Sequence, residues 1–144
     1  MAKRMKTDLI VVHCSATPRD MDIGAVEIDG WHKARGWNGI GYHRVIRRDG
    51  TIEEGRGLDS VGAHVEGQNS HSIGVCVIGG VDEHGKPQSN FSGAQWGSLK
   101  KVILELLRLY PGCRVAGHNE FSTKACPSFD AKAWWATVKD AANP

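Results

Sequence analysis

The chain has 144 residues and a formal net charge of +2, and 40% of its residues are hydrophobic. This length suits one domain, residues 1–144, built around one core. The small net charge argues against the concentrated basic surface of a typical nucleic-acid-binding domain, and no apolar run approaches the length that spans a bilayer. The basic residues 1–6 precede no apolar stretch of signal-peptide length, so we expect a chain made in the cytoplasm of the cell that expresses it.

Short apolar or β-branched runs bounded by polar residues and glycine predict the strands. In chain order we expect a strand over 8–14, a helix over 25–35, strands over 42–48, 51–54 and 73–79, a loop over 80–93, a helix over 94–110, a strand over 114–117, a loop over 119–130 and a helix over 131–141. The first strand ends at His13, beside a polar loop. Asp49-Gly50 is a hairpin turn signal, so at least one strand pair is antiparallel.

Apolar side chains spaced by three and four residues predict the helices. The clearest helix covers 94–110 and is stopped by Pro111, while Asp130 can cap the last helix. Trp96 and Trp134 follow this helical spacing, so we assign them to packing. Because strands and helices interleave, we predict an α/β fold in a single domain, with a central mixed β-sheet flanked by helices.

Three side chains offer the chemistry of a metal site: His13 at a strand end, and His118 and Cys126, eight residues apart, in and beside a loop. Catalytic zinc commonly takes three ligands from His, Cys and carboxylate, and leaves a fourth position for water. The spacing of the three is not a zinc-finger pattern. Most histidines bind no metal, and a cysteine taken alone is more often a packed thiol than a ligand. The residue types and spacing therefore leave both metal binding and packing open.

The other cysteines and two of the other histidines carry simpler predictions. Cys14 and Cys76 lie in apolar runs, so we expect them to be buried. Cys113 follows a Pro-Gly turn and has no predicted role. His32 and His84 lie in a predicted helix and a polar loop, and we expect both to be solvent-exposed.

Four segments of the chain, in this order, resemble the type 2 N-acetylmuramoyl-L-alanine amidases, and among them the compact amidase endolysins of T-odd bacteriophages. Animal peptidoglycan recognition proteins are similar to the same core. The segments are VVHCSAT (11–17), GWNGIGYHRVIRRDGTIEEGR (36–56), VGAHVEGQNSHSIGVCVIGG (61–80) and GHNEFSTKACPSFD (117–130). The resemblance implies a phage endolysin that hydrolyses the amide bond between N-acetylmuramic acid and L-alanine of peptidoglycan.

The resemblance also implies which residues act. One zinc ion per chain would be held by His13, His118 and Cys126, in a groove or at one edge of the sheet. Tyr42 and Lys124 would be the catalytic side chains. Lys124 is a compact cation suited to stabilise a developing oxyanion. A phenol with an ordinary pKa near 10 is a poor general base, so Tyr42 is expected to donate a hydrogen bond or to position water.

His64 matches a substrate-groove position of the resembled enzymes, so substrate binding is expected of it. The resemblance implies a monomer that consists of the catalytic domain alone, without a separate cell-wall-binding domain. Its partner would be peptidoglycan, with no nucleic acid and no membrane insertion. The protein would be made in the host cytoplasm and act on the cell wall after release.

Three alternatives remain open at this point. A hydrolase with a cysteine nucleophile would use Cys126 or Cys14 with a nearby histidine. A wall-recognition protein without catalysis would share the core, although in the resembled recognition proteins a cysteine at the position of Cys126 accompanies amidase activity. The resembled phage enzymes also bind and inhibit an RNA polymerase. We retain an RNA polymerase as an alternative partner. In the resembled enzymes polymerase binding depends partly on the N-terminal segment, and the short basic segment before the first strand of this chain does not match it.

Overall fold

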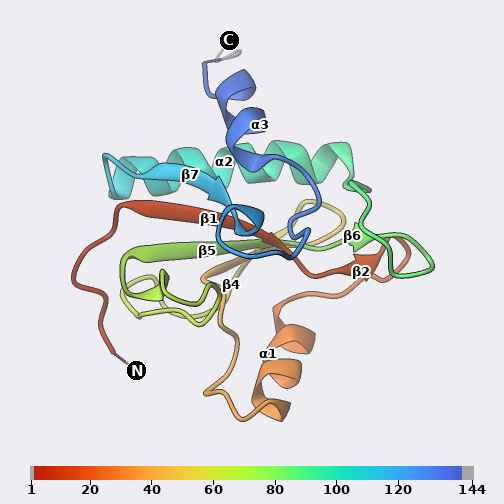
Figure 1. The fold of residues 1–144 in the computed structure, drawn as a ribbon, viewed down its shortest axis with the longest axis horizontal. Helices are drawn as coiled ribbons and strands as arrows, with labels where there is room; N and C mark the ends of the chain where they lie inside the picture. Colours follow the sequence, from red (N-terminus) through yellow and green to blue (C-terminus); the bar gives the residue numbers. More distant parts are fainter. Residues whose placement is uncertain (1, 141–144) are drawn as a thin grey trace.

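Strands alternate with helices along the chain in the computed structural model, which describes residues 2–140 (Figure 1). The strands are β1 (Leu9–Cys14), β2 (Thr17–Pro18), β3 (Arg44–Ile46), β4 (Ile52–Glu54), β5 (Ser72–Val77), β6 (Gly80–Val81) and β7 (Arg114–Gly117). The helices are α1 (Ala25–Ala34), α2 (Gly93–Leu109) and α3 (Ala131–Val138), with short 3₁₀ turns η1 (Asn69–His71) and η2 (His118–Glu120).

The central sheet has the strand order β4-β3-β5-β1-β7. Neighbouring strands from β3 to β7 are parallel, and β4 pairs antiparallel with β3 across the turn at Asp49-Gly50. The predicted mixed sheet in an α/β fold is therefore confirmed. Parallel strands bring their carboxyl ends to one edge of a sheet, which is where such folds commonly place a functional site.

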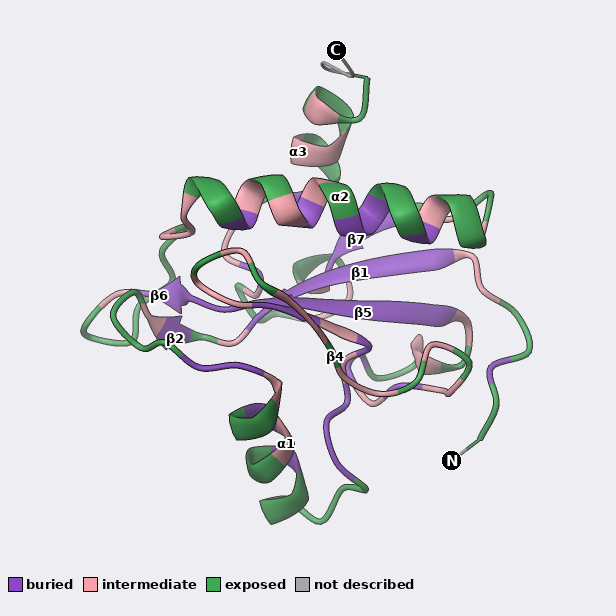
Figure 2. Ribbon diagram, turned by 180° about the vertical axis from the view of Figure 1, so that it is seen from behind, coloured by how far each residue is buried: buried purple, intermediate pink, exposed green. Residues whose placement is uncertain are grey.

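The two faces of the sheet are covered differently. Helix α2 crosses one face and α1 lies on the other side, as both views show (Figures 1 and 2). Strands β1 and β5 are buried along their whole length, while α2 is exposed on the side away from the sheet (Figure 2). The larger core lies under α2 and includes Ile10, Val12 and Ile103. Smaller clusters around Val11 and Cys76 occupy the other face and leave room there for polar side chains.

Most predicted elements are present, with small differences at their ends. The strand expected over 42–48 is shorter, because only Arg44–Ile46 pairs with both neighbours. The region 80–93, expected to be a loop, begins with β6, which pairs with β2 in a separate two-stranded sheet. The last helix begins at the predicted cap, where the Asp130 carboxylate accepts a hydrogen bond from the N–H of Ala133. That helix ends at Val138, and position 141 of the expected range lies outside the described residues.

The packing predictions agree with the structure in two cases. Cys14 and Cys76 are buried, and the rings of Trp96 and Trp134 pack against the larger core with centroids 5.5 Å apart. Across residues 2–140, no helix combines the length and the apolarity that crossing a bilayer requires.

Candidate metal centre

Strands β1 and β7 bring two histidines to the same edge of the sheet. The β-branched run of β1 is fully buried and carries His13 near its carboxyl end. Strand β7 pairs with β1 in parallel, with Val12 opposite Gly117, so the chain leaves β7 at His118 beside His13. The two imidazole rings lie with centroids 4.7 Å apart. Strand pairing therefore joins two residues that are far apart in the sequence.

The loop after η2 delivers the cysteine. The side-chain amide of Asn119 donates hydrogen bonds to the carbonyls of Ala125 and Phe129, and the Ser128 hydroxyl donates to the carbonyl of Gly80 in β6. These contacts hold the loop over the carboxyl end of β1. There the backbone N–H of Cys14 donates to the Cys126 Sγ at 3.2 Å.

His13, His118 and Cys126 each present one ligand atom, and the three atoms lie within 4.8 Å of one another. The Cys126 Sγ is 3.9 Å from the His13 Nδ1. A hydrogen bond with the Cys14 thiol, together with burial, raises the pKa of the Cys126 thiol. A metal ion that binds here must therefore displace a proton from Cys126.

A second buried histidine lies against His13, the first candidate ligand. His13 is 1% exposed and its Nε2 lies 2.8 Å from the Nδ1 of His64, which is itself 8% exposed. Burial lowers the pKa of His13 well below its usual value, and lowers that of His64 to about 3. Both rings are therefore neutral at pH 7, which is the form of histidine that binds a metal.

Tyr42 comes just before β3 and also packs beside His13, with the two rings 5.0 Å apart. Burial, and after it the neighbouring thiols, raise the pKa of Tyr42 well above its usual value, so the phenol keeps its proton. His32 supports this segment: its Nδ1 accepts a hydrogen bond from the N–H of Gly41, and its ring packs against Tyr42 with centroids 5.5 Å apart.

The prediction that His32 is solvent-exposed is wrong, because its side chain is only 6% exposed. Its position four residues after Ile28, on the buried face of α1, was the signal that could have shown this. His84 is exposed, as expected.

Lys124 is exposed in the same loop as Cys126. Burial is the main cause that lowers the pKa of both His118 and His13, and the positive charge of Lys124 lowers both further; for His13 this charge comes after those of His64 and His118. Within residues 2–140, no carboxylate forms an ion pair with Lys124. The lysine charge near the two histidines is thus not neutralised by an acidic side chain of the described chain.

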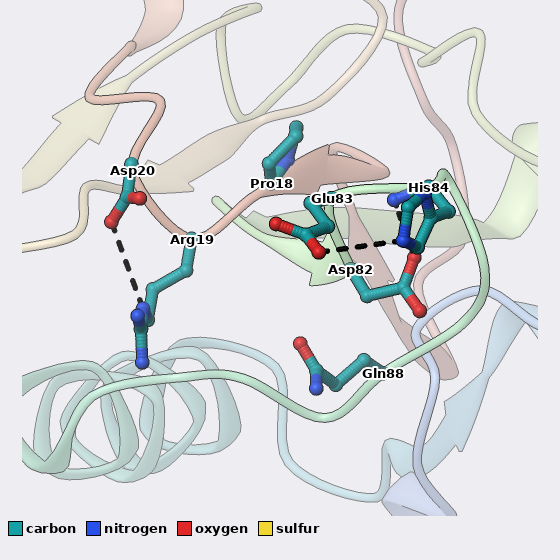
Figure 3. Close-up of a pocket in the computed structure, with 7 residues that line it drawn as sticks. All are labelled: Pro18, Arg19, Asp20, Asp82, Glu83, His84 and Gln88. Atoms are coloured by element: carbon teal, nitrogen blue, oxygen red, sulfur yellow. Dashed lines mark hydrogen bonds and ion pairs between the residues drawn. The ribbon is translucent and has the colours of Figure 1, made fainter.

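Two of the hollows outside the three candidate ligands have a mostly polar lining. One opens beside Tyr42 and is lined by Ser15, Ile28, Trp31, His32, Arg35 and Tyr42. The other lies next to β2 and β6 and is lined by Pro18, Arg19, Asp20, Asp82, Glu83, His84 and Gln88 (Figure 3). Its ion pairs, Arg19–Asp20 and Glu83–His84, join sequence neighbours with exposed side chains, and such pairs are weak. The first hollow is connected to the candidate ligands through Tyr42, whose ring lies 5.0 Å from that of His13.

Comparison with known proteins assigns the chain to a family. The model of the family Amidase_2, N-acetylmuramoyl-L-alanine amidase, matches residues 3–129. The chain is 52% identical to an endolysin of Klebsiella phage KP32 and 50% identical to an endolysin of Escherichia phage T7; each match covers 92% of this chain and 88% of the relative.

A solved structure agrees with these sequence matches. The N-acetylmuramoyl-L-alanine amidase LysC from Clostridium intestinale URNW superposes with a TM-score of 0.80 at 29% identity, covering 94% of this chain and 87% of that one. Because the family model spans most of the sequence, the protein belongs to the N-acetylmuramoyl-L-alanine amidase family.

Proposed function

We propose that this protein is a zinc-dependent phage endolysin that hydrolyses the amide bond between N-acetylmuramic acid and L-alanine in peptidoglycan. The observation that carries the proposal is the convergence of His13, His118 and Cys126 at one point of an amidase fold. On this proposal the protein acts on the cell wall, and peptidoglycan is its partner.

The donor set fits zinc. Two neutral imidazoles and one thiolate are ligands that zinc prefers, and three protein ligands leave one coordination position free, as catalytic zinc sites require. A zinc ion held by these residues would supply a Lewis acid that polarises a carbonyl group and lowers the pKa of water toward neutrality. The backbone N–H of Cys14, 3.2 Å from the Cys126 Sγ, would stabilise the thiolate as a ligand.

Tyr42 is proposed as a hydrogen-bond donor. Its raised pKa keeps the phenol protonated, so it can donate to a substrate oxygen or orient water but cannot act as a base at neutral pH. His32 and Gly41 hold the segment that carries it. Changing Tyr42 to Phe keeps the ring and removes only the donor, so we expect a fall in kcat with little change in stability.

Lys124 is proposed to stabilise the negative charge that develops on the carbonyl oxygen during attack on the amide. Its ammonium group is not paired with a carboxylate within residues 2–140, and after burial its charge contributes to lowering the pKa of both candidate histidine ligands. Removing a donor that stabilises an oxyanion typically reduces kcat by about 10²–10³-fold. Lys124→Ala should show a loss of that size, while Lys132→Ala, an exposed lysine of α3, should not.

The hollow beside Tyr42 is proposed to hold part of the substrate. Trp31 is 43% exposed there, and the Arg35 guanidinium lies 5.7 Å from the centroid of the Trp37 ring. Exposed aromatic rings provide flat apolar surfaces against which sugars can stack, and a guanidinium can bind a carboxylate of the stem peptide.

A cysteine-nucleophile mechanism is the main competitor. The Cys126 thiol lies near the imidazole of His13, as such a mechanism needs. However, nucleophilic cysteines combine a lowered pKa with access to the substrate. The hydrogen bond between Cys14 and Cys126 raises the pKa of Cys126 and lowers that of Cys14 to about 7. Cys14 is only 4% exposed, so the thiol with the lowered pKa is buried, and the more exposed thiol of Cys126 keeps its proton unless a metal displaces it.

Mass spectrometry of digested peptidoglycan tests the bond that is cut. The proposal predicts release of free stem peptides that begin with L-alanine, together with intact glycan strands. New reducing sugar ends would instead identify a glycosidase and overturn the proposal, as would products cut only within the stem peptide.

A further inference from the structure

His64 lies in a recess formed by two glycines behind His13. A methyl group added at Gly74 or Gly62 would come within 2.6 Å or 2.7 Å of the His64 ring, respectively. The Oδ1 of Asn69 accepts hydrogen bonds from the backbone N–H groups of His64 and Val65, both at 2.9 Å. The ring is therefore held in a fixed place, and its 8% exposure leaves little surface for a substrate.

A chain of hydrogen bonds leads from the Gln68 carbonyl, just before η1, through Ser72 and His64 to His13, and the direction of the donors is determined at the Gln68 end. The Ser72 hydroxyl donates its only hydrogen to the Gln68 carbonyl at 2.7 Å. The Ser72 Oγ, 3.1 Å from the His64 Nε2, must then accept, so His64 carries its hydrogen on Nε2. The Nδ1 of a neutral His64 has no hydrogen, so it accepts from the Nε2–H of His13 at 2.8 Å.

This direction leaves the Nδ1 of His13 without a hydrogen. That atom faces the metal-ligating group, 3.9 Å from the Cys126 Sγ. The opposite tautomer of His13 would place a hydrogen on the same atom and block it as a ligand. Among the described residues, no carboxylate forms an ion pair with His13 or His64, so no acidic group favours a charged form of either ring.

We propose that His64 is a positioning residue that selects the Nε2–H tautomer of His13 and so presents a bare Nδ1 to the metal. The proposal rests on the zinc site proposed above and gives His64 a role other than substrate binding. Ser72 and the Gln68 carbonyl belong to the same hydrogen-bond chain, because they determine the tautomer of His64 itself.

Zinc affinity, measured by competition with a chromophoric chelator, tests the role without any activity assay. Loss of a residue that orients a metal ligand typically weakens binding by about 10–100-fold, which we expect for His64→Leu. His64→Asn should retain most of the affinity, because its Oδ1 replaces the Nδ1 as acceptor. His71→Leu, a matched change at the end of η1, should bind zinc like the wild type, since His71 contacts Asp8 instead.

Nitrogen-15 NMR of the histidine rings provides a second readout on the metal-free wild type and on Ser72→Ala. We expect the wild-type His13 and His64 both to carry hydrogen on Nε2, and Ser72→Ala to populate the other tautomer of both. This measurement decides the question even if His64→Leu fails to fold. Wild-type His13 with hydrogen on Nδ1, or a folded His64→Leu that binds zinc as tightly as the wild type, would overturn the inference. A wild type that binds no zinc would instead overturn the proposed function.

Discussion

Replacing Gly74 by alanine tests whether the recess for His64 is as tight as the structure indicates. The added methyl would approach the Cγ, Nδ1 and Cδ2 of His64 to 2.6, 2.8 and 2.9 Å, all closer than carbon atoms normally pack. Gly74 has little freedom to move, because its N–H donates to the His43 Nδ1 at 3.0 Å and its carbonyl accepts from the His43 N–H at 2.8 Å. Overpacking of this kind costs about 1–3 kcal/mol.

The matched control is Gly97→Ala in α2. Gly97 is exposed inside the helix, and an added methyl would meet nothing within 4 Å. Since glycine in a helix interior is less favourable than alanine by about 0.5–1 kcal/mol, this variant should be stabilised. Urea unfolding of the metal-free proteins, followed by circular dichroism, should show a lower free energy of unfolding for Gly74→Ala and a higher one for Gly97→Ala than for the wild type. The Gly74→Ala protein should also bind zinc more weakly, and a Gly74→Ala protein as stable as the wild type would refute the reasoning.

Two further predictions concern pH. Burial lowers the pKa of His43 from 6.5 to about 4, so between about pH 6.5 and pH 4 the unfolded chain binds one more proton than the folded chain. About 3 kcal/mol of stability is lost as the pH falls to about 4, and urea titrations of His43→Gln should show a correspondingly flatter profile. The hydrogen bond with His71 lowers the pKa of the half-exposed Asp8. Asp8→Asn should lower the free energy of unfolding by about 0.2–1 kcal/mol at neutral pH. This difference from the wild type should vanish in acid, once the pH falls through the lowered pKa of Asp8; a difference that stays constant with pH would contradict the prediction.

The sequence predicted the elements whose patterns are strong. The strand β1 was recognised because burial on both faces leaves a continuous β-branched run, and the helix α2 because burial along one stripe leaves a spacing of three and four residues. Strands β2 and β6 were missed. Each has two residues and pairs only with the other, so neither carries a periodic signal.

The site was harder to predict than the fold. Nothing local in the sequence shows that His118 and Cys126 meet His13, because their contact depends on the parallel pairing of β1 with β7 and on a loop held by Asn119. The resemblance to a family named these residues. It did not show the hydrogen-bond chain behind His64, which exists only in the folded chain.

Zinc content and wall lysis, measured on the same protein samples, test the central claim most directly. The account predicts one zinc ion per chain and lysis in the wild type, and the same in Cys113→Ser, whose half-buried thiol lies outside the ligand group. Cys126→Ser should lose both zinc and lysis, and a chelator should abolish wild-type lysis until zinc is restored. Full lysis by metal-free wild type, or by Cys126→Ser, would contradict the account.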